Sequence, residues 1–196
     1  MRRLITFSFL LAAASTMATA SAAETWRVDP GHSSATFTVR HLVFAIVRGS
    51  VPIREGGLVT DGSTLPVSVS ATLDAAKIES GNDKRDSDLR GPDWLETDKY
   101  PTISFKSTKV IPGADASSFS VVGDLTIHGV TKSVTLSCKY LGGTGGQGRR
   151  HAGYEATTTI DRRDFGLNWA RQTPGGELIA GNDVQLTLDV EAVSGS

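Results

Sequence analysis

The sequence predicts an all-β protein whose strands form one antiparallel sandwich or barrel. Three observations support this fold class. Apolar and polar residues alternate strictly in seven segments, a pattern typical of a strand with one buried face. Turn residues separate these segments. Only the stretch 82–95 has helix features, and no window shows helical apolar spacing over four turns.

The alternating segments follow one another along the chain. In 35–40, Ala35, Phe37 and Val39 share one face, while threonine and arginine occupy the other. The other segments with this pattern are 67–73, 102–106, 119–127, 133–140, 154–160 and 184–191. Turn signals are predicted at Gly56-Gly57, Asp61-Gly62, Pro112-Gly113, His128-Gly129, Gly142-Gly143, Pro174-Gly175-Gly176 and Gly181-Asn182. No linker or repeat interrupts the pattern after residue 24, which predicts one domain.

The stretch 82–95 begins with two helix-capping residues. Asn82 or Asp83 is expected to cap a turn or two of helix that ends before Gly91-Pro92, and Asp93-Trp94-Leu95 is expected to add another turn. The sequence therefore predicts one short helical insertion among the strands.

The first 23 residues differ from the rest. Met1-Arg2-Arg3 is a positive segment, Leu4–Ala14 is apolar, and small residues follow up to Ala23, an order typical of a secretory signal peptide. The apolar run is shorter than the ~20 residues of a membrane-spanning helix. We expect cleavage after Ala22 or Ala23, leaving residues 24–196 as one domain in the periplasm.

The composition of the remaining chain excludes several classes of protein. Without the leader, 173 residues remain, and 18 basic residues face 21 acidic ones, a net charge of −3. A mildly acidic chain without a basic run is not expected to bind nucleic acid. The single cysteine, Cys138, cannot form an intrachain disulfide; it alternates in phase with Leu136 and Tyr140, which predicts a buried, inert thiol.

No motif points to catalysis or to a metal. Residues 143–148 match GxGxxG, but a strand is expected after them, and pyrophosphate binding needs a helix. Residues 86–97 lack the ligands of a calcium loop, no serine stands in a GxSxG elbow, and the four histidines do not pair at metal-ligand spacing. Asp161 and Asp164 are interpreted as local charge partners of Arg162 and Arg163. We therefore expect no catalytic set, no metal and no cofactor other than a bound lipid.

Six ordered segments carry a family resemblance. They are 26–42, Val47-Arg48-Gly49, Arg85-Asp86 with Leu89-Arg90, Tyr100–Ser107, Gly123–Thr131, and Arg163–Leu167 with the closing strand. Together these segments resemble the YceI family of lipocalin-like periplasmic proteins, from about Trp26 to Ala192. The chain departs from the family pattern at Val51, Ile53, Asp88 and Trp94, which bears on the identity of the ligand.

The resemblance implies an extended eight-stranded antiparallel lipocalin-like barrel with one short helical insertion. It also implies a long apolar cavity for a polyisoprenoid or similar amphiphilic lipid, such as an isoprenoid quinone, a polyprenyl phosphate or a fatty-acid derivative. The family has no general enzymatic activity. The function expected is that of a periplasmic carrier; the alternatives are an enzyme acting on a lipid head group and a redox accessory protein. A homodimer is left open, and no membrane span is expected.

On this interpretation the ligand contacts follow from the strand faces. The predicted wall residues are Phe37, Val39, Phe105, Leu125, Ile127, Leu136, Ile160, Leu186 and Leu188. Further contacts are predicted at Phe44, Trp94, Leu95, Phe165 and Trp169. A phosphate head group is expected to meet Arg40, Arg48 or Arg85, since a guanidinium donates two parallel hydrogen bonds to it.

Overall fold

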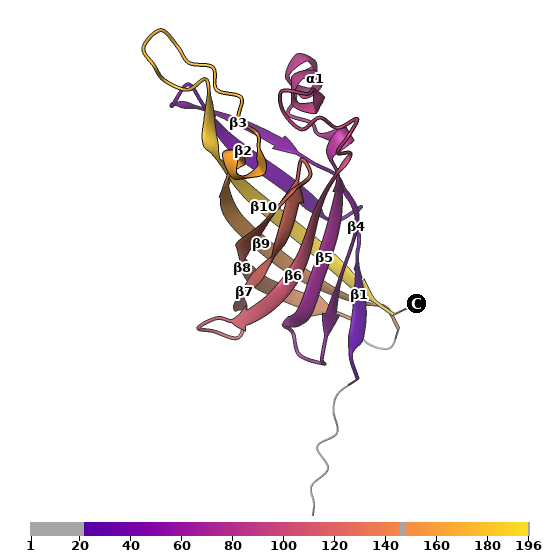
Figure 1. Ribbon diagram of the computed structural model, residues 1–196. Helices are drawn as coiled ribbons and strands as arrows, with labels where there is room; N and C mark the ends of the chain where they lie inside the picture. Colours follow the sequence, from indigo (N-terminus) through magenta and orange to yellow (C-terminus); the bar gives the residue numbers. More distant parts are fainter. Residues whose placement is uncertain (1–21, 146–147, 196) are drawn as a thin grey trace, which may run out of the picture.

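The strands wind into a closed antiparallel barrel, capped at one end by a helix (Figure 1). The computed structural model describes residues 22–145 and 148–195, so all but the last two residues of the predicted signal peptide lie outside the described residues. The strands are β1 Glu24–Val28, β2 Ser34–His41, β3 Ala45–Ser50, β4 Ile53–Thr60, β5 Pro66–Asp74, β6 Thr102–Pro112, β7 Ser118–Ile127, β8 Val130–Thr144, β9 Arg150–Asp161 and β10 Ala180–Ser194.

The barrel closes because one long strand pairs with both ends of the sheet. β10 pairs with β9 on one edge and with β1 and β2 on the other, where Trp26 faces Ser194 and Phe37 faces Leu186. β1 and β2 therefore act as one interrupted strand, and β3 and β4 form a second. This gives eight strand positions around the barrel, so the predicted barrel is confirmed and the sandwich is excluded.

All seven alternating segments lie inside observed strands. In β7, for example, Phe119, Val121, Gly123, Leu125 and Ile127 are buried, while the residues that alternate with them are more exposed. Alternation places successive side chains on opposite faces of a sheet, so the apolar set faces the barrel interior. Cys138 shares this inner face in β8 and is buried, as predicted.

Four of the predicted turns lie at strand ends. Asp61-Gly62 follows β4, Pro112-Gly113 closes β6, and Pro174-Gly175-Gly176 lies in the loop before β10. His128 and Gly129, both with positive φ, make the two-residue connection between β7 and β8. Such a pair of φ values is favoured in tight hairpins because it matches the strand twist.

Three of the turn predictions are wrong. Gly56-Gly57 lies within β4, where a Cβ on Gly57 would stand 2.9 Å from the Trp26 carbonyl oxygen of β1. Gly181-Asn182 lies in β10 at a register irregularity, and Gly142-Gly143 lies in the last part of β8. The glycines of β4 allow two strands to approach closely, a role that local sequence cannot distinguish from a turn.

The helical insertion is α1, Asp83–Arg90, and it lies above one end of the barrel (Figure 1). The Asn82 side chain accepts a hydrogen bond from the Arg85 backbone N–H at 2.9 Å, which confirms the predicted cap. Residues 93–95 form hydrogen-bonded turns and no helix. Two short 3₁₀ helices follow strands, η1 Ala75–Lys77 and η2 Arg162–Phe165. Among the described residues, no helix is long and apolar enough to cross a membrane.

A buried arginine fixes η2 to the start of β10. Only 2% of Arg162 is exposed, and its guanidinium donates to the carbonyl oxygens of Leu167, Ala180 and Gly181 and to the Asn182 side chain. Burial lowers the pKa of Arg162. The expected local charge pairing is confirmed for Arg163, which binds Asp161. Arg162 instead donates to the segment after η2 and to the first residues of β10.

Candidate ligand-binding site

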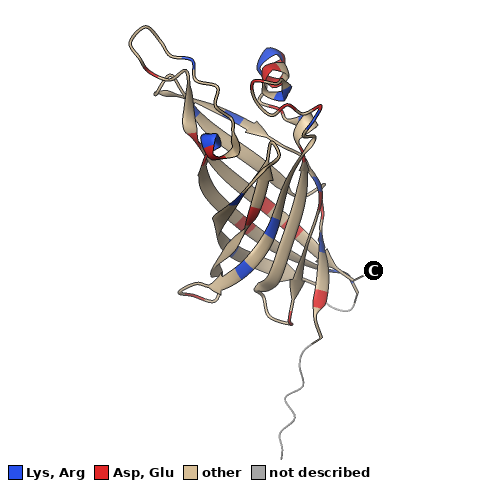
Figure 2. Cartoon of the chain, in the orientation of Figure 1, with Lys and Arg blue, Asp and Glu red and all other residues tan. Residues whose placement is uncertain are grey.

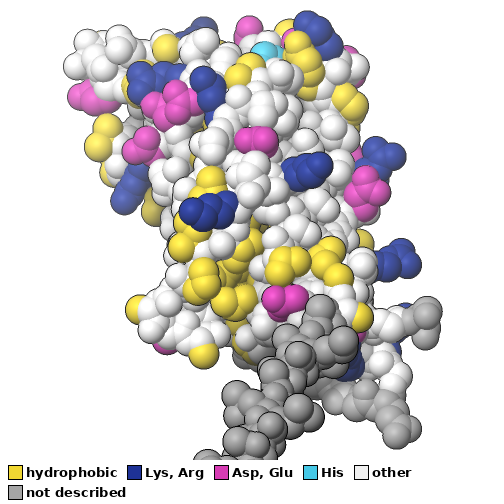
Figure 3. All heavy atoms as spheres, turned by 60° about the horizontal axis from the view of Figure 1, so that its bottom comes forward, with side chains coloured by type: hydrophobic (Ala, Val, Ile, Leu, Met, Phe, Trp, Pro, Cys, Tyr) yellow, Lys and Arg dark blue, Asp and Glu magenta, His cyan; other side chains and the backbone are white. Residues whose placement is uncertain are grey.

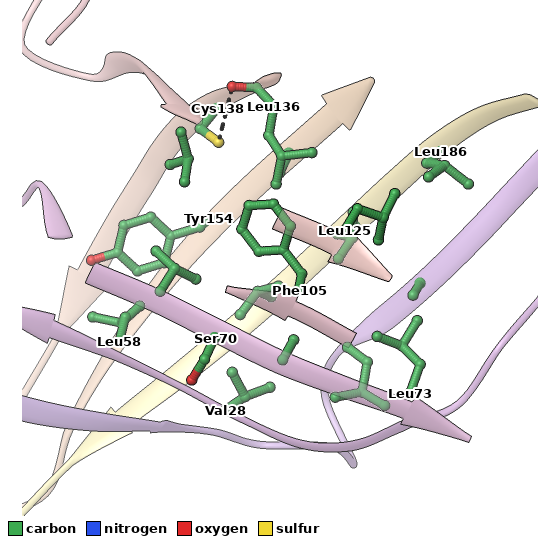
Figure 4. Close-up of a pocket in the computed structure, with 18 of the residues that line it drawn as sticks. Val28, Leu58, Ser70, Leu73, Phe105, Leu125, Leu136, Cys138, Tyr154 and Leu186 are labelled. Carbon is green, nitrogen blue, oxygen red and sulfur yellow. Dashed lines mark hydrogen bonds between the residues drawn. The ribbon is translucent and has the colours of Figure 1, made fainter. Parts of the chain in front are cut away.

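The barrel encloses a cavity between the inner faces of its strands. Together with its opening to solvent, the empty space between the side chains is about 1220 Å³. Side chains from distant parts of the chain meet there, including Val28, Phe105, Leu125, Tyr154 and Leu186 (Figure 4). The space between them is apolar because each strand directs aliphatic side chains inward at several alternate positions.

The cavity lining is almost entirely hydrocarbon. Its described members include one ionisable carboxylate, the exposed Glu155, and no lysine, arginine or histidine. The Cys138 thiol donates to the Leu136 carbonyl oxygen at 3.7 Å, and the Tyr154 hydroxyl donates to the Thr64 carbonyl oxygen at 3.1 Å. Burial raises the pKa of Cys138 to about 11 and that of Tyr154 to about 12, so both groups are neutral at pH 7.

Two phenylalanine rings in the wall depend on glycines in the neighbouring strands. A Cβ on Gly123 would stand 2.4 Å from the Phe105 ring, and one on Gly49 would stand 2.4 Å from the Phe37 ring. Any larger residue at either position would push its ring out of place. Gly123 therefore leaves the room that the Phe105 ring occupies, and it pairs with Ser107 beside a register shift.

Aromatic residues fill the barrel end that bears the β4–β5 and β8–β9 turns. Tyr154 contacts Phe119 edge-on at 6.3 Å between ring centroids, and Tyr140 lies 5.5 Å from Tyr154. The Trp26 indole donates to the Thr60 hydroxyl at 3.2 Å. Hydrophobic side chains also gather on the outside of this end, with charged side chains around them (Figure 3).

The structure brings seven of the predicted wall residues into the cavity lining. They are Phe37, Phe105, Leu125, Ile127, Leu136, Leu186 and Leu188. Leu95, Ile160 and Phe165 instead pack within the hydrophobic core outside the cavity lining, and Val39 is half-buried on β2. Their part in ligand contact stays a prediction.

The other predicted contacts lie outside the cavity. Trp94 and Trp169 contact each other with ring centroids 5.2 Å apart, and the Arg162 guanidinium lies 5.3 Å from the Trp94 ring centroid. Phe44 is 78% exposed at the turn between β2 and β3.

The three arginines predicted for a head group do not converge. Arg85 donates to the Ser80 hydroxyl at 2.6 Å and to the Ser80 carbonyl oxygen at 2.8 Å, which ties it to the loop before α1. Arg40 and Arg48 are exposed on the outer face of the β2–β3 hairpin.

Sequence reasoning missed most of the lining, since it names only seven of the 27 described lining residues. Val69, Leu73, Phe119, Val121 and Ala156 share the alternating faces already recognised, so extending those faces would have found them. Val28, Val51, Ile53 and Leu58 also line the cavity, but their strands are short or interrupted by glycine and proline and lack a regular alternation.

A cluster of carboxylates and imidazoles lies apart from the cavity. Ligand atoms of Asp29, His32 and Glu191 lie within 4.8 Å of one another. Asp29 binds His32 at 3.1 Å, and Glu191 binds His151 at 2.7 Å. The hydrogen bond lowers the pKa of Asp29 and raises that of His32. Both carboxylates thus have imidazole partners, so pairing accounts for the cluster.

His128 has another setting, in the tight turn between β7 and β8. Its Nε2 lies 3.4 Å from a carboxylate oxygen of Glu96, and its ring lies edge-on to Tyr100 with 4.7 Å between centroids. These contacts fasten the turn to the segment that follows α1.

Known proteins resemble this chain along most of its length. A protein named UPF0312 from Vibrio cholerae is 32% identical over 164 residues, 83% of this chain and 82% of the relative. Protein YceI of Escherichia coli is 33% identical over 164 residues, with the same coverage of 83% and 82%.

A solved structure shares the fold. A polyisoprenoid binding domain from Saccharophagus degradans, implicated in plant cell wall breakdown, superposes with a TM-score of 0.61 and 14% identity, over 86% of this chain and 98% of that domain. The YceI-like domain family matches residues 26–192, from the tryptophan of β1 to the buried alanine of β10. Because the family match spans most of the chain and relatives above 30% identity cover 83% of it, the chain belongs to the YceI-like domain family.

Proposed function

We propose that the protein is a carrier or reservoir that holds an amphiphilic lipid of the isoprenoid type by its tail inside the barrel. The observation that carries this proposal is the cavity itself, whose described lining has no cationic side chain and almost no polar atom. Such a lining offers a hydrocarbon chain favourable burial and offers a polar substrate few partners. The name of the Saccharophagus degradans domain, which shares this fold, supports the isoprenoid class.

The free energy of burying the lipid tail determines how much of the tail the cavity has to enclose. Burial of hydrocarbon is worth about 0.8 kcal/mol per CH₂, so one five-carbon unit contributes roughly 3–4 kcal/mol before the costs of ordering are subtracted. A few units therefore suffice for tight binding. Chain length is then selected by the length of the apolar space, since the lining has few groups that recognise a particular atom.

Binding is favoured over catalysis by the same lining. An enzyme acting on a head group needs an acid or base within hydrogen-bond reach of the reacting atoms, and the described lining contains one carboxylate, that of the exposed Glu155, and no histidine, lysine or arginine. We also propose that residues 1–23 direct export to the periplasm and are removed there. Isolation from a periplasmic extract and N-terminal sequencing would give a chain beginning at Ala23 or Glu24.

The direct test is gentle purification followed by native mass spectrometry and solvent extraction. We expect an apolar adduct that extraction releases. An empty protein that also takes up neither quinones nor polyprenyl phosphates from detergent would overturn the proposal. Turnover of a polyprenyl phosphate head group by the wild-type protein would favour the enzyme instead.

A further inference from the structure

The β2–β3 hairpin ends in an exposed apolar tip. Val43 is 65% exposed, Phe44 is 78% exposed and Ile46 is 39% exposed. The tip projects at the same end of the barrel as α1, beside the loop that precedes β10 (Figure 1). We call Leu42, Val43, Phe44 and Ile46 the hairpin tip. Exposed apolar side chains that are contiguous mark interaction surfaces more often than isolated ones do.

The backbone of the tip is strained. Leu42 has φ 50° and Val43 has φ 69°, in the left-handed region. A β-branched residue rarely adopts that conformation, and glycine or asparagine would fit it better. The Leu42 N–H donates to the Ile179 carbonyl oxygen at 3.1 Å and the Phe44 N–H to the Leu42 carbonyl oxygen at 2.8 Å, which hold the turn in place. Exposed apolar side chains in a strained turn indicate a functional site, because neither their exposure nor their backbone conformation favours folding.

The hairpin connects this tip with the cavity. Directly paired residues of an antiparallel ladder share one face. Phe37, which lines the cavity, pairs with Gly49, and Val39 pairs with Val47 on the same face one step nearer the tip. The next pair on that face is His41 with Ala45. The face that begins in the cavity wall therefore reaches Val43 and Phe44 with one imidazole in its path.

The opposite face of the hairpin is cationic. Arg40 pairs with Ile46, and Arg48 pairs with Thr38, so both guanidinium groups share the outer face with an exposed isoleucine. The sequence contains no aspartate or glutamate from Pro30 to Arg54, and the hairpin ribbon accordingly shows basic but no acidic residues (Figure 2). An apolar tip on a hairpin that carries two arginines and no carboxylate matches the interface of an anionic lipid bilayer, and the exposed Glu177 of the neighbouring loop is a carboxylate that opposes this attraction.

We propose that the hairpin tip docks the barrel on an anionic lipid surface, with Val43 and Phe44 in the interface and Arg40 and Arg48 against the phosphates. The further step, transfer of a lipid along the Val39–Val47 face into the cavity, rests on the proposed function. Docking itself does not, because it needs only the tip and its charges.

The test is co-sedimentation of the full mature chain with vesicles of phosphatidylglycerol and phosphatidylethanolamine, compared with vesicles of phosphatidylcholine. A double variant, Val43→Asn with Phe44→Ser, removes the apolar tip and relieves the strained backbone. We expect its binding to anionic vesicles to fall by about tenfold or more. Arg48→Gln is expected to weaken binding by about fivefold, and only to anionic vesicles. Leu141→Ser is the matched control, since Leu141 is 57% exposed at the other end of the barrel.

The outcomes separate docking from lipid carriage. The docking proposal is overturned if the wild-type protein binds neither kind of vesicle at low salt. It is also overturned if the double variant binds vesicles as well as the wild type does. Loss of a wild-type dimer in the double variant, with vesicle binding unchanged, assigns the tip to a second copy and also overturns it. Geranylgeraniol supplied in detergent should load both proteins equally. If wild type binds vesicles but never loads geranylgeraniol, docking stands and the proposed function fails.

Discussion

Filling the cavity from one side should weaken lipid binding by a predictable amount. Ala156 lies in β9, lines the cavity, and pairs with Cys138 on one side and Leu188 on the other, both of which also line it. The substitution Ala156→Phe therefore places a phenyl ring inside the space that a lipid tail would occupy.

The expected loss follows from the displaced hydrocarbon. The ring excludes about one five-carbon unit, and burial at about 0.8 kcal/mol per CH₂ makes that unit worth roughly 3–4 kcal/mol. Part of this is offset because a shorter buried tail also loses less conformational freedom. A net loss of about 3 kcal/mol corresponds to roughly a hundredfold weaker binding, at about 1.4 kcal/mol per tenfold.

Isothermal titration with geranylgeraniol measures this directly, after removal of any lipid that co-purifies. The heat-capacity change on binding should also become less negative in the variant, because less apolar surface is buried. Gln185→Phe is the control, since Gln185 is exposed on the outside of β10. Affinity of the folded Ala156→Phe protein within threefold of wild type, or an equal loss in the control, would refute the location of the tail.

Three further predictions concern stability and pH. Gly123→Ala should lower the free energy of unfolding, measured in urea, by about 1–3 kcal/mol through overpacking. The control Gly153→Ala, whose nearest new contact is 3.5 Å away, should leave this free energy nearly unchanged. Equal effects of the two substitutions would contradict the steric argument. Arg162→Met should cost about 3 kcal/mol or more, because buried carbonyl oxygens lose their donor; a shift in the urea midpoint worth under 1 kcal/mol would show that water replaces the guanidinium. NMR titration should give His32 a pKa above 6.5, returning towards 6.5 in Asp29→Asn. The stabilisation from His32 is complete below pH 6.5 and lost as the pH rises through its folded pKa, while that from Asp29 is complete above pH 3.8 and lost as the pH falls through its lowered pKa.

Predictions from the sequence are correct mainly for features that a short stretch of neighbouring residues determines. Period-two alternation located β2 and β5 to β10, and a capping asparagine located α1. Such predictions fail where contact with a segment distant in the sequence determines the position of a residue. Gly56 and Gly57 were read as a turn, yet they lie in β4 because β1 passes close to them. The local charge pattern predicts that Arg162 pairs with a nearby aspartate, yet Arg162 is buried and donates to the carbonyl oxygens of Leu167, after η2, and of Gly181, in β10.

The sequence by itself determined the strands, their inward faces, the single buried thiol and, through its resemblance, the barrel. These properties are local, because side-chain direction in a strand follows from position alone. Only the tertiary structure decided which inward residues leave space between them. Phe105 and Leu186 face the cavity whereas Ile160 and Phe165 pack in the core, since the difference depends on how far the opposite wall lies from each side chain. The tertiary structure alone also placed Phe44 outside, because the hairpin extends beyond the barrel that β10 closes.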